Sequence, residues 1–117
     1  MKASEIIKLD CTIAGNLDKL KAALIHIKPF EGHDPDDITV EKLEKVQRRI
    51  DKLSGYHIGY FMQTKYNDDR PNYWHATILE HVHQESKCVD TVFGLSLFEV
   101  FAKATIAMWI LMKKKGQ

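Results

Sequence analysis

Cysteine is scarce in this 117-residue chain, which has only Cys11 and Cys88. The two stand alone and form no C-x-x-C pair, so the sequence shows neither the spacing of a zinc site nor that of a redox motif. We expect a reduced pair in a cytoplasmic protein rather than a disulfide. Residues 1–5 also lack the uninterrupted apolar core of a signal peptide, so no export is predicted.

Long apolar runs are also missing. The longest candidate, residues 95–112, is slightly shorter than the roughly 20 residues that a membrane-spanning helix needs. It contains Glu99 and Lys103, and each charge costs up to about 3 kcal/mol at mid-membrane, which cancels the gain from the apolar side chains. Because the two are spaced i,i+4, we expect them to pair on an exposed strip of a soluble helix. A membrane anchor is disfavoured.

No excess of one charge is present either, since 17 Lys and Arg nearly cancel 16 Asp and Glu. A nearly neutral chain exerts no long-range attraction on nucleic acids or acidic membranes. The one basic cluster, Lys113–Lys115, is also explained by the preference of cations for a helix C-terminus. H-E-x-x-H, G-x-S-x-G and glycine-rich phosphate loops are all absent from the sequence. We therefore predict a protein that is not an enzyme and uses no cofactor.

A well-marked helix is present at the C-terminal end. Ser96 and Glu99 have the S-x-x-E spacing of a capping box and predict a helix over 96–115. From Leu97 to Met112 this helix is apolar on almost every side. Such a helix must be buried within a domain or in an oligomer.

Two amphipathic helices are predicted in the N-terminal half. Over 3–28, Ile6, Ile13, Leu20 and Ile27 recur at intervals of seven, and Gly15 leaves open whether this is one helix or two. Thr39 can cap a second helix over 40–53. Its apolar stripe contains Leu43, Val46, Ile50 and Leu53. We expect the two helices to pack as an antiparallel pair, although the heptad spacing would also suit a coiled coil between subunits.

A β-hairpin is predicted next, from strands 56–66 and 73–83 around the turn-forming residues 67–72. Pairing Tyr66 with Trp74 assigns alternate residues to two faces. The face expected to meet the core contains Ile58, Tyr60, Met62, Trp74, Ala76, Ile78 and Val82. The other face contains His57, Phe61, Gln63, Lys65, His75, Thr77, Leu79, His81 and His83.

Together these elements predict one α+β domain over residues 1–117. Its parts are a helical pair over 3–53, a hairpin with a possible third strand (88–93) over 56–93, and a buried helix over 96–115. We expect them to form helix–sheet–helix layers.

Three histidines form the one candidate metal site. The predicted register places His57 opposite His83, and His81 shares their face because it is two residues from His83. Three imidazoles with one open position would suit a catalytic zinc ion, and Cys88 could complete a closed site. The alternative, which we favour, is a partly covered sheet face on which histidine is common.

The segments 73–78 and 94–104 resemble a family of small phage and prophage proteins, the phage "ABA sandwich" domain. In that family a W-x-A strand, here Trp74 to Ala76, precedes a G-x-[ST]-x-x-E-A helix, here beginning at Gly94. Val100 stands where alanine is usual. The resemblance implies a helix–sheet–helix arrangement and a mobile-element origin, but no established activity and no catalytic residue. HicB-type antitoxins and double-stranded-RNA-binding domains share the helix start, but the basic residues of the latter are absent here.

The apolar helices offer more hydrophobic surface than one small sheet covers, which predicts a homo-oligomer or another protein as partner. We therefore expect a cytoplasmic, non-enzymatic interaction or assembly module. The candidate contact residues at the end of the last helix are Trp109, Met112, Lys113, Lys114 and Lys115. The alternative is a nucleic-acid-associated regulator that uses the exposed hairpin face and the Lys113–Lys115 tail.

Overall fold

The computed structural model of the chain describes residues 17–64 and 73–116. The elements are α2 (Leu17–Leu24), η1 (Lys28–Phe30), η2 (Pro35–Asp37), α3 (Val40–Ser54), β1 (Tyr56–Thr64), β2 (Tyr73–Val82), β3 (Glu85–Gly94) and α4 (Leu97–Lys114). The strands form one antiparallel sheet in the order β1-β2-β3. The α+β class, the third strand and the C-terminal helix are therefore confirmed.

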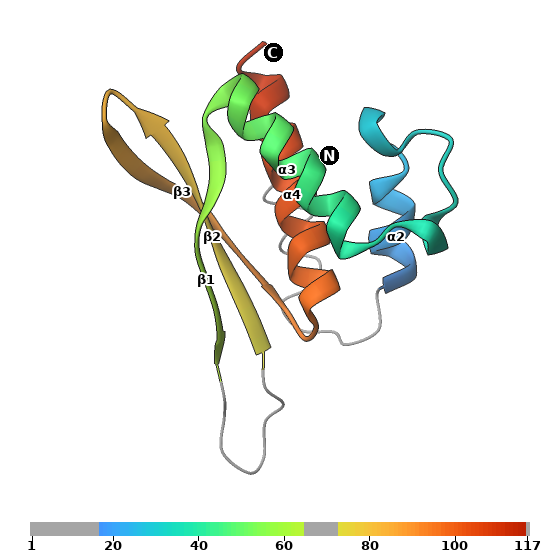
Figure 1. Cartoon of the computed structure of the whole chain (residues 1–117). Helices are drawn as coiled ribbons and strands as arrows, with labels where there is room; N and C mark the ends of the chain where they lie inside the picture. The colour runs from blue at the N-terminus through green and yellow to red at the C-terminus, as the bar shows by residue number, and fades with distance from the viewer. Residues whose placement is uncertain (1–16, 65–72, 117) are drawn as a thin grey trace.

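Helix α4 lies at the centre of the molecule. It packs against all three strands, against α3 and against α2. The described helices lie on one side of the sheet, with α4 and α3 directly against it and α2 beyond them (Figure 1). Within residues 17–64 and 73–116, no helix covers the other side of the sheet (Figure 1). The described helices therefore all pack on one face of the sheet.

The start of α4 follows from its capping box. Ser96 Oγ accepts a hydrogen bond from the Glu99 backbone N–H at 3.1 Å, and the Glu99 carboxylate accepts one from Leu95 N–H. These bonds satisfy donors that a helix start otherwise leaves unpaired. Beyond the cap, small and medium side chains are fully buried between the sheet and the other helices. No helix in the described part of the chain is long and apolar enough to span a membrane.

The prediction that Glu99 and Lys103 pair on an exposed strip of α4 is wrong. Lys103 is 1% exposed and Glu99 6% exposed, and their charged atoms lie 3.3 Å apart. Lys103 Nζ also donates a hydrogen bond to the Phe93 carbonyl oxygen at 2.8 Å. The pair therefore lies inside the junction of β3 and α4, where each charge is compensated by the other and by hydrogen bonds.

Helix α3 forms as predicted, and its two ends explain why. The Thr39 side chain accepts a hydrogen bond from Lys42 N–H at 3.3 Å, and Gly55 ends the helix with a φ of +80° that favours glycine. Leu43, Val46 and Ile50 are buried, whereas Leu53 is 54% exposed, contrary to the predicted stripe.

In the described residues, α2 and α3 each pack mainly against α4, so the contact between the two N-terminal helices is made largely through α4. Leu20, Leu24 and Ile27 are buried, as their spacing indicates. The part of the predicted helix over 3–16, with Ile6, Ile13 and Gly15, lies outside the described residues, and the helix ends at Leu24 instead of residue 28 because a turn and η1 follow.

The predicted hairpin register is wrong. Trp74 lies opposite Gln63 instead of Tyr66, a shift of three residues, and an odd shift exchanges the faces of a strand. Residues 60–63 therefore change sides: Phe61 stacks on Trp74 at 5.1 Å, and Tyr60 and Met62 point away from the helices. On β2 the predicted core residues Ala76 and Ile78 are buried, whereas Val82, at the end of the strand, is 39% exposed and was wrongly assigned to the core.

A β-bulge at Gly59 limits this exchange to one part of β1. The extra residue makes the shift even for Tyr56–Ile58, so Ile58 still packs against the core. A Cβ at position 59 would overlap the Leu79 side chain, which explains why glycine stands there.

Candidate interaction surface on the open sheet face

The side chains that point away from α4 form a surface that we call the open face. In the described strands it consists of His57, Tyr60, Met62, Tyr73, His75, Thr77, Leu79, His81, Ser86, Cys88, Thr91 and Phe93. None of these residues is Asp, Glu, Lys or Arg, although such residues make up 28% of the chain. The solvated face of an antiparallel sheet is usually polar and carries charged residues, so this face is unusual in having only uncharged polar, aromatic and apolar side chains.

An aromatic cluster occupies the open face around His75. The His75 ring stacks on Tyr60 at 6.3 Å and lies 6.2 Å from Tyr73 and 6.1 Å from Phe93. Tyr60 is 56% exposed, Phe93 36% exposed, and Met62, directly opposite His75 on β1, 42% exposed. Because these rings pack against one another, their side chains are already ordered. Binding a partner would therefore cost them little conformational entropy.

His75 also carries an unpaired polar atom. Its Nδ1 is buried and has no hydrogen-bond partner among the residues that the structure describes. A buried polar atom without a partner costs about 1–3 kcal/mol.

The two edges of the sheet are less suited to binding than its face. Besides the bulge at Gly59 in β1, a second irregularity in β3 leaves Val89 without a partner between Asp90 and Cys88. Bulges twist an edge strand and so discourage the addition of another strand. The open face, and not an edge, is therefore the stronger candidate surface.

The three histidines of the predicted metal site are not brought together. His57 lies opposite Leu79, His81 lies opposite Ser86, and His83 lies in the turn between β2 and β3 with a φ of +49°. The predicted opposition of His57 and His83 is thus wrong, because it depended on the wrong register. In 17–64 and 73–116, no group of three or more His, Cys, Asp or Glu residues is placed to hold a metal ion. Cys88, the proposed fourth ligand, is a free and exposed thiol.

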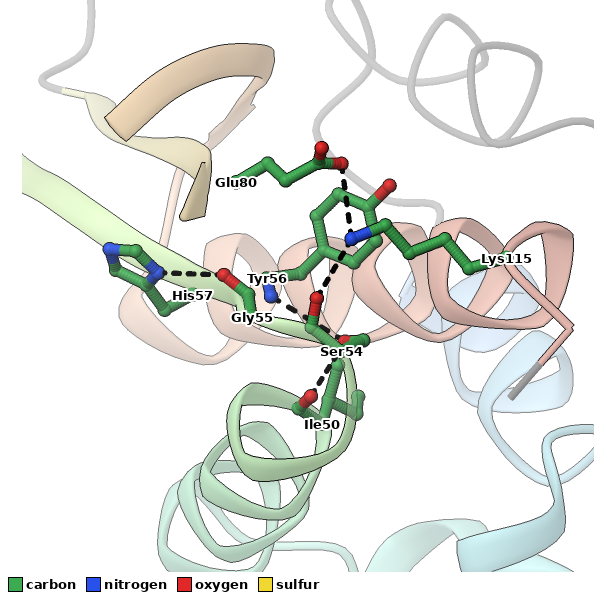
Figure 2. Close-up of polar contacts among 7 residues, drawn as sticks. All are labelled: Ile50, Ser54, Gly55, Tyr56, His57, Glu80 and Lys115. Atoms are coloured by element: carbon green, nitrogen blue, oxygen red, sulfur yellow. Dashed lines mark hydrogen bonds and ion pairs between the residues drawn. The ribbon is translucent and has the colours of Figure 1, made fainter. Parts of the chain in front are cut away.

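The predicted contact residues at the end of α4 divide into two groups. Met112 is buried, and Lys115 belongs to a polar cluster that fixes the end of α4 to the start of β1 (Figure 2). Lys115 Nζ donates a hydrogen bond to the Ser54 carbonyl at 2.9 Å and lies 3.5 Å from the Glu80 carboxylate. Lys113 and Lys114 remain exposed, and Trp109 is half-buried.

Tyr56 gives this cluster an unusual titration. Burial, followed by a hydrogen bond to the Glu80 carboxylate, raises the pKa of Tyr56 to about 12. The same bond, together with the charge of Lys115, lowers the pKa of Glu80. Lys115 Nζ lies 4.5 Å from the centre of the Tyr56 ring. At neutral pH the raised pKa keeps the Tyr56 phenol protonated and the lowered pKa keeps Glu80 ionised, so the arrangement indicates a structural tie rather than an acid–base site.

The open face was the main feature that the sequence patterns did not predict. Tyr60 was expected in the core, and Phe93 was given no face, yet both lie in the exposed cluster. The lack of charge along the whole of β1 is a partial signal. In β3 both alternating sets contain a charged residue, so the uncharged face emerges only once the pairing and the two bulges are known.

Comparison with known proteins adds no relative to this picture. No protein-family model, no curated protein sequence and no solved structure matches the chain. The resemblance to phage ABA sandwich proteins stays a prediction.

Proposed function

We propose that this protein is a non-enzymatic interaction module that forms a homodimer through its open face. The observation that carries the proposal is the exposed, uncharged aromatic cluster of Tyr60, Met62, His75 and Phe93, which no described helix covers. A patch of this kind on a soluble protein is typical of an interaction site.

A second copy suits this surface better than a charged partner does. Two sheets can pack face to face about 10 Å apart, and two uncharged faces bring no like charges together. The formal net charge of the chain is only +1, so long-range repulsion between copies is small.

The expected dimer is weak. Three strands about 4.8 Å apart, each about 30 Å long, give a flat area of roughly 400 Å² before the relief of the side chains is counted. A stable interface typically buries about 800 Å² on each partner. The open face supplies part of that area, so the dimer should form only as the protein concentration rises.

The phage-like origin and the cytoplasmic location belong to the same proposal. The W-x-A strand at Trp74 and the helix start at Gly94 support the first. The exposed Cys88, which has no disulfide partner among residues 17–64 and 73–116, supports the second, because exposed thiols persist in reducing compartments.

Light scattering coupled to gel filtration, over a range of protein concentrations, tests the dimer. Tyr60→Lys places a charge on the open face and should shift the protein to monomer, because an unpaired charge in a closed interface is costly. Leu53→Lys is the matched control, since Leu53 is 54% exposed and Tyr60 56% exposed, and Leu53 lies on α3. It should leave the dimer intact. A monomer at every concentration, or a dimer that Tyr60→Lys does not weaken, would contradict the proposal.

A second candidate is single-stranded nucleic acid, favoured by the exposed rings of Tyr60 and Phe93. Bases stack on such rings with little regard to sequence. The open face, as far as the structure describes it, offers no Lys or Arg for the phosphates. Fluorescence anisotropy with a labelled oligonucleotide separates the two functions, since nucleic-acid binding would weaken steeply as salt increases.

A further inference from the structure

A groove crosses the C-terminal half of α4, on the helical side of the molecule and away from the open face. A cavity of about 590 Å³ lies between α2 and α4, and another of about 420 Å³ lies between α3 and α4. Trp109 and Lys113 line both cavities, so the two are adjacent on either side of Trp109, and we call them together the α4 groove.

The floor of the α4 groove is apolar. Ile27 and Ile110 contribute on the α2 side, Leu53 on the α3 side, and Trp109 lies between them. Leu53 is one of the most exposed large apolar side chains of the described residues. The exposure of Leu53, which departs from the predicted apolar stripe of α3, extends the apolar floor of the groove to its rim.

The rim of the α4 groove is basic. Its charged lining residues are Lys28, Arg49, Lys113 and Lys114, and no Asp or Glu lines either cavity in the part of the chain that the structure describes. The whole chain is nearly neutral, so this concentration of one sign is local. Lys113 Nζ lies 4.9 Å above the centre of the Trp109 ring, which holds a cation directly over the apolar floor.

We propose that the α4 groove binds an acidic amphipathic helix of a partner protein. The helix would place apolar side chains on Trp109 and Leu53 and carboxylates beside Arg49, Lys113 and Lys28. Such a helix would lie across α4 from the α2 side to the α3 side and would use anchors at i, i+3 or i+4, and i+7.

The distribution of the cations favours a peptide over a fatty acid. Lys28 and Arg49 lie on the α3 side and Lys114 on the α2 side, with Lys113 common to both. A fatty acid carries a single carboxylate and would need cations at one end only. Several carboxylates spread along a helix match cations at both ends.

Binding of three synthetic peptides of equal length tests the proposal. The first has a leucine face flanked by glutamates, and the second has the same face flanked by lysines. The third keeps the glutamates but has serines in place of the leucines. The Trp74→Phe variant leaves Trp109 as the only tryptophan, because the chain has two, so its fluorescence reports on the groove. Only the first peptide should bind and shift the emission, and its affinity should fall as salt increases.

Two neighbouring arginines provide a matched pair of variants. Arg49→Glu reverses a charge that lines the groove and should weaken the acidic peptide by about tenfold or more. Arg48→Glu makes the same change one residue away, at a side chain 72% exposed that lines a different cavity, and should alter the affinity by less than about threefold.

Several outcomes would overturn the proposal. They are no binding of the acidic peptide, equal binding of the lysine-flanked peptide, and equal effects of Arg48→Glu and Arg49→Glu. Tighter binding of laurate than of the peptide would assign the groove to a lipid. A change in oligomer mass caused by Arg49→Glu, but not by Arg48→Glu, would assign it to a second copy of this chain.

Discussion

Tyr56 is the residue at which three elements meet. Its buried ring lies under Lys115 at the end of α4, and its hydroxyl bonds Glu80 of β2, while Tyr56 itself begins β1. The Ser54 side chain, which donates to the Ile50 carbonyl at 2.6 Å, secures the end of α3 beside it (Figure 2). The junction therefore depends on one phenol remaining protonated.

Alkaline pH should destabilise the protein through Tyr56. The pKa of Tyr56 is about 12 in the folded protein against 10.0 for an ordinary tyrosine. A raised pKa means that the stabilisation is complete below pH 10 and is lost as the pH rises through about 12. Urea unfolding at a series of pH values should show this loss, and Tyr56→Phe should remove it while costing about 1 kcal/mol at pH 7.

Absorbance of the phenolate provides an independent measurement of the same titration. One of the four tyrosines of the native protein should ionise close to pH 12, and Tyr56→Phe should abolish that late step. Tyr60→Phe is the control, because it removes an exposed phenol and should keep the late step. A late step that survives Tyr56→Phe would assign the raised pKa to another tyrosine.

At the scale of elements, the junction of β3 and α4 is held by a buried ion pair. Lys103 reaches back to the Phe93 carbonyl, and Glu99 holds both Lys103 and the Leu95 N–H. The pair thus fixes the angle at which α4 leaves the sheet. Removing one member leaves the other charge buried without its counter-ion.

Lys103→Met should lower the free energy of unfolding by about 3–5 kcal/mol, because the Glu99 carboxylate then lies buried without its cation. Adding Glu99→Gln should recover a large part of that loss, since Gln can still accept the Leu95 N–H and carries no charge. Urea unfolding of the two single variants and the double variant gives the coupling free energy. Additive losses would show that the pair contributes no mutual stabilisation.

Local capping patterns in the sequence correctly predicted where α3 and α4 begin. Thr39 and Ser96 begin α3 and α4 where the sequence placed them, because a cap is a short-range hydrogen bond between residues three apart. The i,i+4 spacing also predicted the Glu99–Lys103 contact. It could not reveal that the pair is buried, because the acceptor for Lys103 is the Phe93 backbone, which any residue could supply.

The candidate surface was harder to predict, since it depends on pairing between strands. The turn residues 67–72 indicated a hairpin but did not fix its register, and a shift of three residues moved Tyr60 and Met62 to the open face. The bulge at Gly59 then returned Ile58 to the core. A glycine in a strand suggests a bulge but does not say which neighbours change sides.

At the scale of the whole molecule, α4 separates two surfaces of different chemistry. The open face lies on one side of the sheet and is uncharged, whereas the α4 groove lies among the helices and has a basic rim. A face of the first kind suits a copy of itself, and a groove of the second kind suits an acidic partner. The two surfaces share no residue, so each can be occupied without displacing the other's ligand.

Dimer formation and binding of the acidic peptide should therefore be independent. Isothermal titration should give one peptide per chain both for the wild type, at concentrations where it is a dimer, and for the monomeric Tyr60→Lys variant, with affinities that agree within about twofold. Arg49→Glu should weaken peptide binding by about tenfold or more and leave the dimer unchanged in light scattering. One peptide per two chains would mean that the groove is shared between copies. A peptide that dissociates the dimer would mean that α4 transmits a change between the two surfaces.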